Sequence, residues 1–372
     1  MKLVVLTNIP TPYRTALFDA IAAECARQGH AFHVLYCAET ELGRHWPYRP
    51  AELRHPHTLL AGWHPRVAGT TAHVNLGVLA ALRRLRPTTL LVAGAWNTPT
   101  MQLAAWSDVP CRRVFWSEGH VDAALHPDGF IAWARRGAYR SYDAFAVPNR
   151  RSADWARSQA GEAKPILDLP NAIDTDFYRP ATADERSAAR RTLGLPAGGR
   201  VLVQVGALTE RKGVVPLARS FLGLSGEIRG DATLLFVGTG PQEGELRALE
   251  AASAGALRLV GQRDAAGVRE VLHAADAFVL NTFLDPNPLA PIEAAACGLP
   301  LVLSAKAGNV GELIDEAGLG LTIADPAHPA AALTAALVWT EADLARTRHA
   351  RVAATQGFAA DAVARSLVRQ LG

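Results

Sequence analysis

The chain has 372 residues, of which 49% are hydrophobic and 20% charged, a balance typical of globular proteins. This length exceeds what one hydrophobic core usually supports, so it predicts two domains. The net charge of only +3 argues against a nucleic-acid platform, and no apolar run is long enough to span a bilayer. The four cysteines show neither CxxC pairing nor metal-ligand spacing, so we expect no disulfide and no zinc site.

The first half of the chain alternates between strand-like and helix-like segments. The opening MKLVVLTNIP is too short for a signal peptide and suits a buried first strand, so we expect a cytoplasmic protein. Such alternation indicates βαβ units around a parallel sheet. The strand-like apolar runs of this half cover residues 3–6, 32–36, 89–94, 113–116 and 143–148.

The second half repeats this scheme, with apolar runs that are typical of buried parallel strands. The turn-rich segment PNAIDTDFYRP separates the halves, so we expect the hinge near residues 171–196. The predicted fold class is α/β with two Rossmann-like domains. Ligands of such sheets bind beyond the carboxyl ends of the strands, which predicts a two-substrate site in the cleft between the domains. The predicted strands cover residues 200–206, 232–238, 257–261, 277–281 and 299–304.

One segment, LDPNPLAPIEAAACG at residues 284–298, carries two carboxylates across a tight loop that runs into a helix. The backbone amides of Leu289 and Ala290 would lie at the helix start, which is a ready site for an anion. Asp285 and Glu293 would then hold hydroxyl groups on either side of a ligand diphosphate. The same residues also suit a structural role, in which Glu293 complements the helix dipole and Asp285 turns the loop.

Two further strand ends carry glycines. Gly206 follows one strand and is followed by the cations Arg211 and Lys212, which can neutralise a diphosphate. Gly238 and Gly240 follow the next strand, where glycine permits close backbone approach or simply a tight turn. Each feature alone is weak evidence for a phosphate-binding site, and it is their order along the chain that makes them informative.

Taken in order, these motifs resemble the donor side of family 4 retaining glycosyltransferases of the GT-B fold. The resemblance rests on GALTERKGV, FVGTGPQEGEL, LDPNPLAPIEAAACG and NAIDTDFYRP, and covers residues 170–314. It implies two Rossmann-like domains facing across a cleft, with acceptor binding in residues 1–175 and donor binding in 176–354. A C-terminal helix at about 355–372 would pack back on the first domain. The implied reaction moves a sugar from a nucleotide diphosphate sugar to a hydroxyl of a glycan, a lipid-linked sugar or a natural product.

The resemblance also implies roles for individual residues. Glu293 would bind the ribose hydroxyls, and Asp285 would act in catalysis by holding the hydroxyls of the donor sugar. Lys212, with Arg211 beside it, would bind the diphosphate. The amides of Leu289 and Ala290 would contact the distal phosphate or the sugar, and the donor loops would include Gly206, Gly238, Gly240 and Asn287.

The chain departs from the family pattern at several of these positions. Asp285 stands where a glutamate is usual, and Ala207 stands where an arginine is common, which leaves Arg211 as the replacement cation. Asn287 and Pro288 occupy positions where the family favours an aromatic residue and glycine, and proline has no amide hydrogen to donate. These departures predict rearranged diphosphate contacts and an unusual donor choice.

The first half should bind the acceptor. The turn NIPTPYR resembles the PYR variant of the same family, and it places Tyr13 and Arg14 at a helix start. We expect Arg14 to contact a polar or anionic acceptor group, with a structural salt bridge as the alternative. Glu118 and His120 follow the fourth strand, and one of them would orient the acceptor hydroxyl or contact the donor sugar, unless both belong to a polar loop.

Neither a cofactor nor a metal ion is predicted. The DxD triplet at Asp174 and Asp176 lies within the segment between the domains, and we interpret it as structural. Residues 1–180 carry a net charge of +5 and residues 181–372 a net charge of −2. Weak peripheral contact of the basic half with the inner face of a membrane is therefore a further hypothesis.

Three other functions fit parts of the pattern. A nucleotide-sugar epimerase would share the two-domain architecture and would need no acceptor pocket. A non-catalytic sugar-nucleotide binding protein would explain why the chain departs from the family pattern at Asp285, Ala207 and Pro288. A Rossmann dehydrogenase is the weakest alternative, because no GxGxxG follows the first strand.

Overall fold

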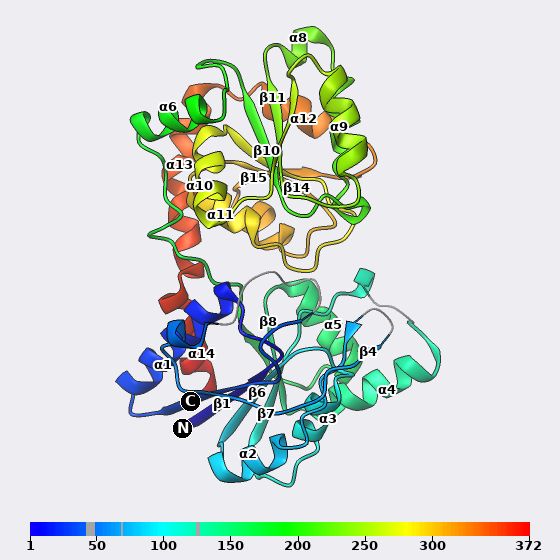
Figure 1. Cartoon of the computed structure of the whole chain (residues 1–372), viewed down its shortest axis with the longest axis vertical. Helices are drawn as coiled ribbons and strands as arrows, with labels where there is room; N and C mark the ends of the chain where they lie inside the picture. The colour runs from blue at the N-terminus through cyan, green and yellow to red at the C-terminus, as the bar shows by residue number, and fades with distance from the viewer. Residues whose placement is uncertain (42–48, 68–69, 124–126) are drawn as a thin grey trace. The chain divides into compact units, whose positions relative to one another are not determined.

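The computed structural model describes the chain apart from residues 42–48, 68–69 and 124–126. The chain divides into two compact units, one formed by Met1–Ala172 with Phe358–Gly372 and the other by Ile173–Gly357. Each unit is built on its own parallel sheet with helices packed around it (Figure 1). The predicted fold class, α/β with two Rossmann-like domains, is confirmed.

The first unit contains a seven-stranded parallel sheet in the order β3-β2-β1-β6-β7-β8-β9. Its strands are β1 (Lys2–Thr7), β2 (Ala31–Tyr36), β3 (His57–Leu59), β6 (Thr89–Ala93), β7 (Arg112–Trp116), β8 (Ala144–Val147) and β9 (Ile166–Asp168). A separate two-stranded ribbon is formed by β4 (Arg66–Val67) and β5 (Thr70–Thr71). The helices are α1 (Pro12–Arg27), α2 (Val78–Leu85), α3 (Pro99–Ala105), α4 (Gly129–Arg140), α5 (Arg150–Ala160) and α14 (Ala360–Leu371), with short 3-10 turns at Pro50–Glu52 and Val121–Ala123.

The second unit contains a six-stranded parallel sheet in the order β12-β11-β10-β13-β14-β15. Its strands are β10 (Val201–Val205), β11 (Thr233–Val237), β12 (Leu257–Gly261), β13 (Ala277–Leu280), β14 (Leu301–Ser304) and β15 (Gly320–Ile323). The helices are α6 (Ala183–Thr192), α7 (Val214–Leu222), α8 (Gly226–Arg229), α9 (Glu243–Ala252), α10 (Ala265–Ala274), α11 (Ala290–Ala296), α12 (Ala330–Leu337) and α13 (Glu341–Thr355). A 3-10 turn spans Glu210–Lys212, a π-helical turn spans Gly311–Glu316, and another 3-10 turn at Gln356–Phe358 ends α13.

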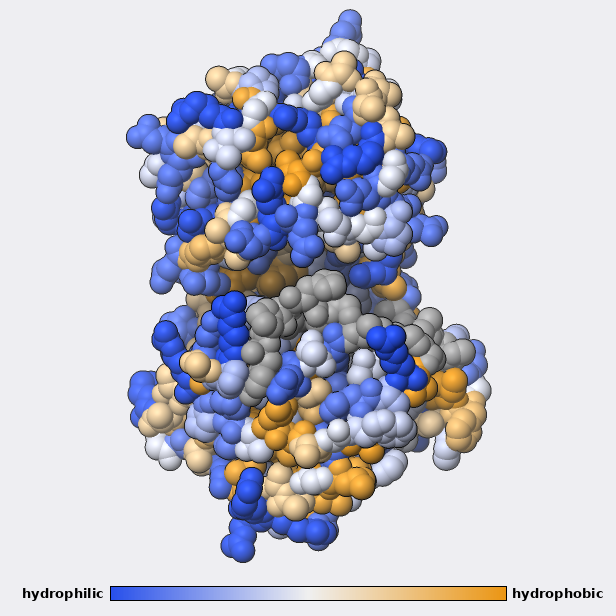
Figure 2. Space-filling model, in the orientation of Figure 1, coloured by the Kyte–Doolittle hydropathy of each residue, from blue (hydrophilic) through white to orange (hydrophobic). Residues whose placement is uncertain are grey.

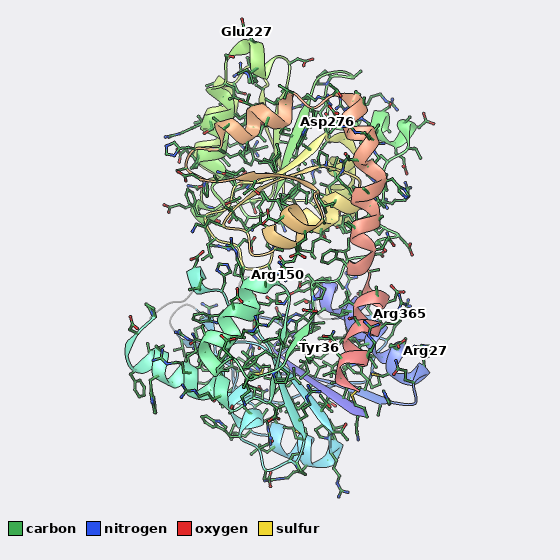
Figure 3. The ribbon with its side chains drawn as sticks, turned by 180° about the vertical axis from the view of Figure 1, so that it is seen from behind. Arg27, Tyr36, Arg150, Glu227, Asp276 and Arg365 are labelled. Carbon is green, nitrogen blue, oxygen red and sulfur yellow. The ribbon has the colours of Figure 1, made fainter. Side chains whose placement is uncertain are left out.

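The chain returns to the first unit in its last helix. In Figures 1 and 3, α14 lies beside α1, and Arg365 and Arg27 project from these neighbouring helices. Val363, Leu367 and Leu371 of α14 are buried in the core that also holds Tyr36 of the sheet. Asp168 at the end of β9 exchanges two hydrogen bonds with Gln370, at 2.8 and 3.1 Å. The C-terminal residues therefore complete the hydrophobic core of the first unit.

All ten strands predicted from the apolar runs are present. The prediction missed β3, β9 and β15, which are edge strands of three or four residues, and the two-residue strands β4 and β5. The apolar pattern is weak in all of these short strands. In the second sheet the chain turns back after β12, so β10 and β13 are neighbours. That reversal of strand order is where open α/β sheets bind ligands, beyond the carboxyl ends of the strands. Within the described residues, no helix combines the length and apolar character needed to cross a membrane.

Candidate functional site

Lys212 and Asp285 meet at the carboxyl edge of the second sheet. Lys212 ends the short turn that follows β10, and Asp285 lies in the loop that follows β13. Their side chains form an ion pair, and each is 12% exposed. Because β10 and β13 are adjacent, the pair bridges the point at which the strand order reverses. The structure thus brings together a cation and a carboxylate that were both predicted as donor-site residues.

Arg211 ties the two loops of this pair together. Its guanidinium donates to the carbonyl of Leu284 at 2.6 Å. Its own carbonyl accepts from the hydroxyl of Thr282 at 2.9 Å and from the amide of Phe283 at 2.8 Å. Arg211 is exposed and lies next to Lys212, as predicted, but its side chain is engaged with the loop backbone. Both predicted cations are therefore engaged in the structure, Lys212 with Asp285 and Arg211 with the carbonyl of Leu284.

The predicted glycines let the loops after β10 and β11 pack backbone against backbone. Gly206 and Gly238 have φ of +146° and +137°, which side-chain-bearing residues rarely adopt. A Cβ on Gly238 would lie 2.1 Å from the carbonyl oxygen of Gly206, and one on Gly240 would lie 2.4 Å from that of Leu208. A Cβ on Gly206 would lie 3.9 Å from the Cε of Lys212. These glycines therefore allow the two loops to pack closely next to the side chain of Lys212.

The loop that carries Asp285 is held by two residues that the sequence reasoning missed. The amide of Gly308 donates to the carbonyl of Asp285 at 2.7 Å, and Asn309 donates to the carbonyl of Pro288 at 2.9 Å. A Cβ on Gly308 would lie 1.7 Å from the carbonyl oxygen of Pro286, so only glycine fits there. Asn287 lies between these anchored positions. The Gly-Asn pair just after β14 was the available signal.

The helix α11 begins directly after this loop. Leu289 precedes its first residue, Ala290, and Pro291 is its second residue, where the missing amide hydrogen costs no helical hydrogen bond. The carbonyl of Leu289 accepts from the amides of Ile292 at 2.9 Å and Glu293 at 3.3 Å. Leu289 and Ala290 therefore stand at the helix start, as predicted, and Glu293 falls in its first turn.

Glu293 is hydrogen-bonded to Tyr178, a residue to which sequence reasoning assigned no role. Burial raises the pKa of Glu293 to about 7, and the hydrogen bond from the Tyr178 hydroxyl opposes that rise. Burial and the neighbouring carboxylate together raise the pKa of Tyr178, so the tyrosine stays protonated and can donate. Tyr178 belongs to the NAIDTDFYRP segment, which was the only signal in the sequence. Glu293 is thus poised between its neutral and charged forms near neutral pH.

In the first unit, Arg14 and Glu118 form an ion pair at 3.3 Å. Arg14 also donates to the hydroxyl of Thr7 at 3.1 Å, and its guanidinium carbon lies 4.5 Å from the centre of the Trp116 ring. Burial lowers the pKa of Arg14, but Tyr13 and Glu118 outweigh that effect and raise it. The structure therefore gathers three predicted residues, Tyr13, Arg14 and Glu118, beyond the carboxyl ends of β1 and β7.

His120 lies deeper than its neighbours in this unit. It is 1% exposed, and its Nδ1 accepts from the amide of Asp122 at 3.1 Å. In the linker, the Asp174 carboxylate accepts from the amides of Asp176 and Phe177 at 3.1 and 2.9 Å, so the DxD triplet forms a turn. Within the described parts of the chain, no group of three or more His, Cys, Asp and Glu side chains is placed to hold a metal ion.

Comparison with known proteins connects this geometry to a family. Residues 185–353 match the family described as "Glycosyl transferases group 1". The glycogen synthase of Mycobacterium tuberculosis is 31% identical over 268 residues, covering 70% of this chain and 62% of that protein. The GDP-mannose-dependent monoacylated alpha-(1-6)-phosphatidylinositol monomannoside mannosyltransferase of Corynebacterium glutamicum is 29% identical over 170 residues, covering 44% of each. The chain thus spans between 44% and 62% of the lengths of these curated relatives.

The fold comparison covers the whole chain. The crystal structure of HepE from Anabaena in complex with UDP superposes with a TM-score of 0.77, covering 100% of this chain and 99% of that one at 16% identity. At that identity the likeness establishes the fold, which is GT-B, with two Rossmann-like domains. The resemblance read from the donor-side motifs is confirmed, and residues 185–353 carry the domain of the glycosyl transferases group 1 on a GT-B fold.

Proposed function

We propose that the protein is a retaining glycosyltransferase that moves a sugar from a nucleotide diphosphate sugar to a hydroxyl acceptor. The observation that carries this proposal is the meeting of Lys212 and Asp285 where the strand order of the second sheet reverses. HepE, which shares the fold, was crystallised with UDP and with UDP-glucose. UDP-sugars are therefore the first donors to test.

The donor site is proposed to work by charge complementarity. Departure of the nucleotide diphosphate develops negative charge, which Lys212, Arg211 and the amides of Leu289 and Ala290 would stabilise. These cations would supply the positive charge that a divalent ion supplies in other transferases. Asp285 would orient Lys212 and accept hydrogen bonds from the donor-sugar hydroxyls, and the Glu293 carboxylate would accept from the ribose.

The first unit is proposed to bind the acceptor. Arg14 is held in one orientation by Glu118, Thr7 and the Trp116 ring, so it can contact a polar or anionic acceptor group without losing side-chain freedom on binding. Tyr13 adjoins it on the same helix start. Glu118 would orient the acceptor hydroxyl, and His120, buried in the same loop, would hold that loop or contact the donor sugar.

A thermal-shift panel of UDP-, GDP-, ADP- and TDP-sugars tests the proposal, because a ligand that binds the folded state raises the melting temperature. We expect stabilisation by one nucleotide family, unchanged by EDTA. Incubation of that donor with candidate acceptors should then give a product that retains the anomeric configuration, as read by NMR. Absence of stabilisation by every donor would contradict the proposal, and epimer formation without acceptor would favour the epimerase alternative.

We also propose that the first unit contacts an anionic membrane surface from the cytoplasmic side, through α4. Phe130 and Trp133 of this helix are 77% and 66% exposed and stack at 5.5 Å, with Ile131 exposed beside them. Figure 2 shows apolar surface at the place that α4 occupies in Figure 1. Arg140 follows Trp133 by two helical turns on the same face, so apolar and basic groups are presented together.

Co-sedimentation with vesicles tests this contact. Wild-type protein should sediment with vesicles rich in anionic lipid and much less with neutral ones, and the Phe130→Ser/Trp133→Ser variant should lose most of the binding. Trp106→Ser is the matched control, because Trp106 is 68% exposed at the end of α3, away from α4 in the sequence. Equal loss in both variants, or no binding by the wild type, would contradict the proposal.

A further inference from the structure

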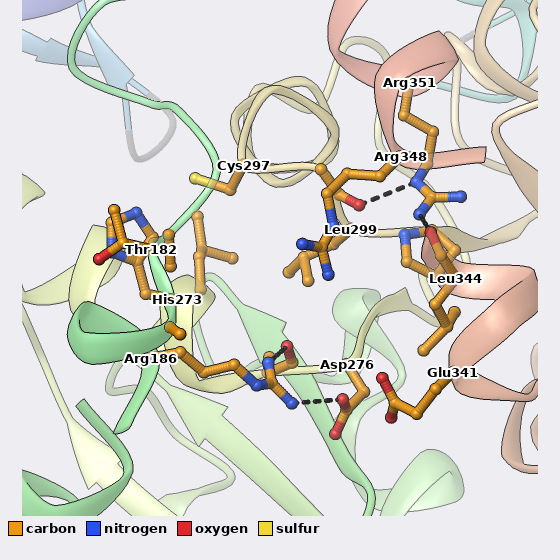
Figure 4. Close-up of a pocket in the computed structure, with 16 residues that line it drawn as sticks. Thr182, Arg186, His273, Asp276, Cys297, Leu299, Glu341, Leu344, Arg348 and Arg351 are labelled. Carbon is orange, nitrogen blue, oxygen red and sulfur yellow. Dashed lines mark hydrogen bonds and ion pairs between the residues drawn. The ribbon is translucent and has the colours of Figure 1, made fainter. Parts of the chain in front are cut away.

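The second unit contains a cavity that has no role in the proposed reaction. It measures about 240 Å³ and lies where β13 and β14 begin, between Asp276 and Pro300. Lys212 and Asp285 follow the opposite, carboxyl ends of the strands, so the cavity is at the other edge of the same sheet. Its other walls come from α6, α13, the end of α10 and the segment that follows α11 (Figure 4).

Arg351 of α13 is a buried cation in the wall of this cavity. It is 4% exposed, and its guanidinium donates to the carbonyls of Gly298 at 2.9 Å and Leu344 at 2.7 Å and to the hydroxyl of Thr347. All three acceptors are neutral, and within the described residues no carboxylate pairs with it. Burial and, to a smaller extent, the neighbouring charge of Arg348 lower the pKa of Arg351 to about 10. A buried charge without a counterion is costly, which makes the wall attractive to an anion.

Arg348 places a second guanidinium in the same space. Among the described residues it has neither an ion pair nor a hydrogen-bond partner, and its side chain lines the cavity. Gly298 has φ of +84°, and a Cβ there would lie 2.8 Å from the Cγ of Arg348. The absence of a side chain at Gly298 therefore leaves the space that the Arg348 side chain occupies. Figure 4 shows Arg348 and Arg186 entering the cavity from different walls.

The two carboxylates that line the cavity, Asp276 and Glu341, are already paired with arginine side chains. Asp276 is buried and is surrounded by Arg186 at 2.6 Å, Arg190 at 2.8 Å and Arg200 at 3.7 Å. Glu341 pairs with one of the same arginines, Arg200, at 2.8 Å. Arg186, Arg348 and Arg351 line the cavity with these two carboxylates, and Arg190 and Arg200 pair with the same carboxylates from outside the lining, so five guanidinium groups stand against two carboxylates. The cavity and its wall carry a local excess of positive charge.

We propose that this cavity binds a compact phosphate-bearing anion, held by Arg348 and Arg351 of α13 and by Arg186 of α6. Guanidinium groups match the geometry of phosphate oxygens and form charge-assisted hydrogen bonds with them. The volume lies just below the 300–1,000 Å³ or so of pockets that hold drug-sized ligands, which favours a small ligand. Either inorganic phosphate or a sugar phosphomonoester has this chemistry.

Isothermal titration of the full chain with inorganic phosphate, and separately with glucose 6-phosphate, tests the proposal. Arg348 is exposed at the rim, so Arg348→Gln should fold normally and should weaken binding about tenfold. Arg346→Gln is the matched control, because Arg346 lies on the same helix and pairs with Asp343 at 2.8 Å. It should bind like the wild type. The tighter of the two probes identifies whether the ligand is free phosphate or an ester.

A third variant, Lys212→Ala, separates this cavity from the donor site. It should retain the binding, because Lys212 is at the opposite edge of the sheet. Binding that Lys212→Ala abolishes and Arg348→Gln leaves intact would assign the anion to the donor site and overturn the proposal. Absence of binding by either probe to the wild type would overturn it as well.

Discussion

Lys212→Ala is expected to lower the rate of sugar transfer by about 10²- to 10³-fold, the loss that follows removal of one preorganised group facing the developing charge. Lys212 is the cation at the point where β10 and β13 end, and its partner Asp285 holds it in place. No other described lysine or arginine side chain pairs with Asp285, so the deletion leaves the leaving diphosphate with Arg211, which is engaged with Leu284. Initial rates at saturating donor and acceptor measure the effect.

Two controls separate lost chemistry from lost stability. The deletion also leaves the partly buried Asp285 without its counterion, which costs about 1–3 kcal/mol of folding free energy. Adding Asp285→Asn should recover much of that stability while activity stays low. Arg219→Ala, on the exposed face of α7 where Arg219 pairs with Glu245, should leave both unchanged. Transfer by Lys212→Ala within threefold of the wild-type rate would contradict the proposed role.

The local pattern of apolar runs predicted the fold and the placement of Lys212 and Asp285 at one edge of the second sheet. Buried parallel strands are continuous apolar runs, so β10, β11 and β13 were visible in the sequence, and the residues after them had to lie at one edge of a sheet. Lys212 and Asp285 follow two of these strands, and the reversal of strand order makes those strands neighbours. Their ion pair follows from topology.

Contacts between distant segments were not predictable in this way. Tyr178 reaches Glu293 from the linker, and Arg14 reaches Glu118 from 104 residues away along the chain. Each contact depends on side-chain packing between elements that the apolar pattern places only roughly. The excess positive charge around Arg351 was not predictable for the same reason, because the arginines that produce it come from α6, α13 and the start of β10. The sequence shows which residues reach an edge of the sheet, and packing decides what they touch.

Glu293→Gln is expected to make the protein more stable at alkaline pH. The folded pKa of Glu293 is about 7, against 4.5 for an unperturbed carboxyl group. Between these values the unfolded state loses its proton while the folded state keeps it, so the carboxyl group reduces the free energy of unfolding as pH rises from 4.5 to 7. The difference amounts to about 3 kcal/mol above pH 7. Denaturant unfolding at pH 4.5 and pH 8 should show the two proteins equal at the lower pH and the variant more stable at the higher.

The same residue should couple donor binding to pH. If the ribose hydroxyls donate to the Glu293 carboxylate, the bound donor favours the ionised form, and affinity should rise with pH until the carboxyl group is ionised near pH 7. The rise is at most about tenfold per pH unit, because one proton is released. A nucleotide diphosphate sugar is the right probe, since its diphosphate loses no proton in this range.

Calorimetric titration of the donor at pH 5.5, 6.5 and 7.5, in two buffers that differ in ionisation enthalpy, reports both affinity and proton release. Wild-type protein should release most of a proton at pH 6.5 and a much smaller fraction at pH 7.5, because the pKa of Glu293 is about 7. Glu293→Gln should bind more weakly and independently of pH, since its side chain has no proton to lose. Tyr178→Phe should shift the pH dependence upward, because the hydrogen bond that it removes favours the carboxylate. A wild-type affinity that is flat across this range would mean that Glu293 does not meet the nucleotide as a carboxylate, and that its burial beneath Tyr178 serves packing of α11 instead.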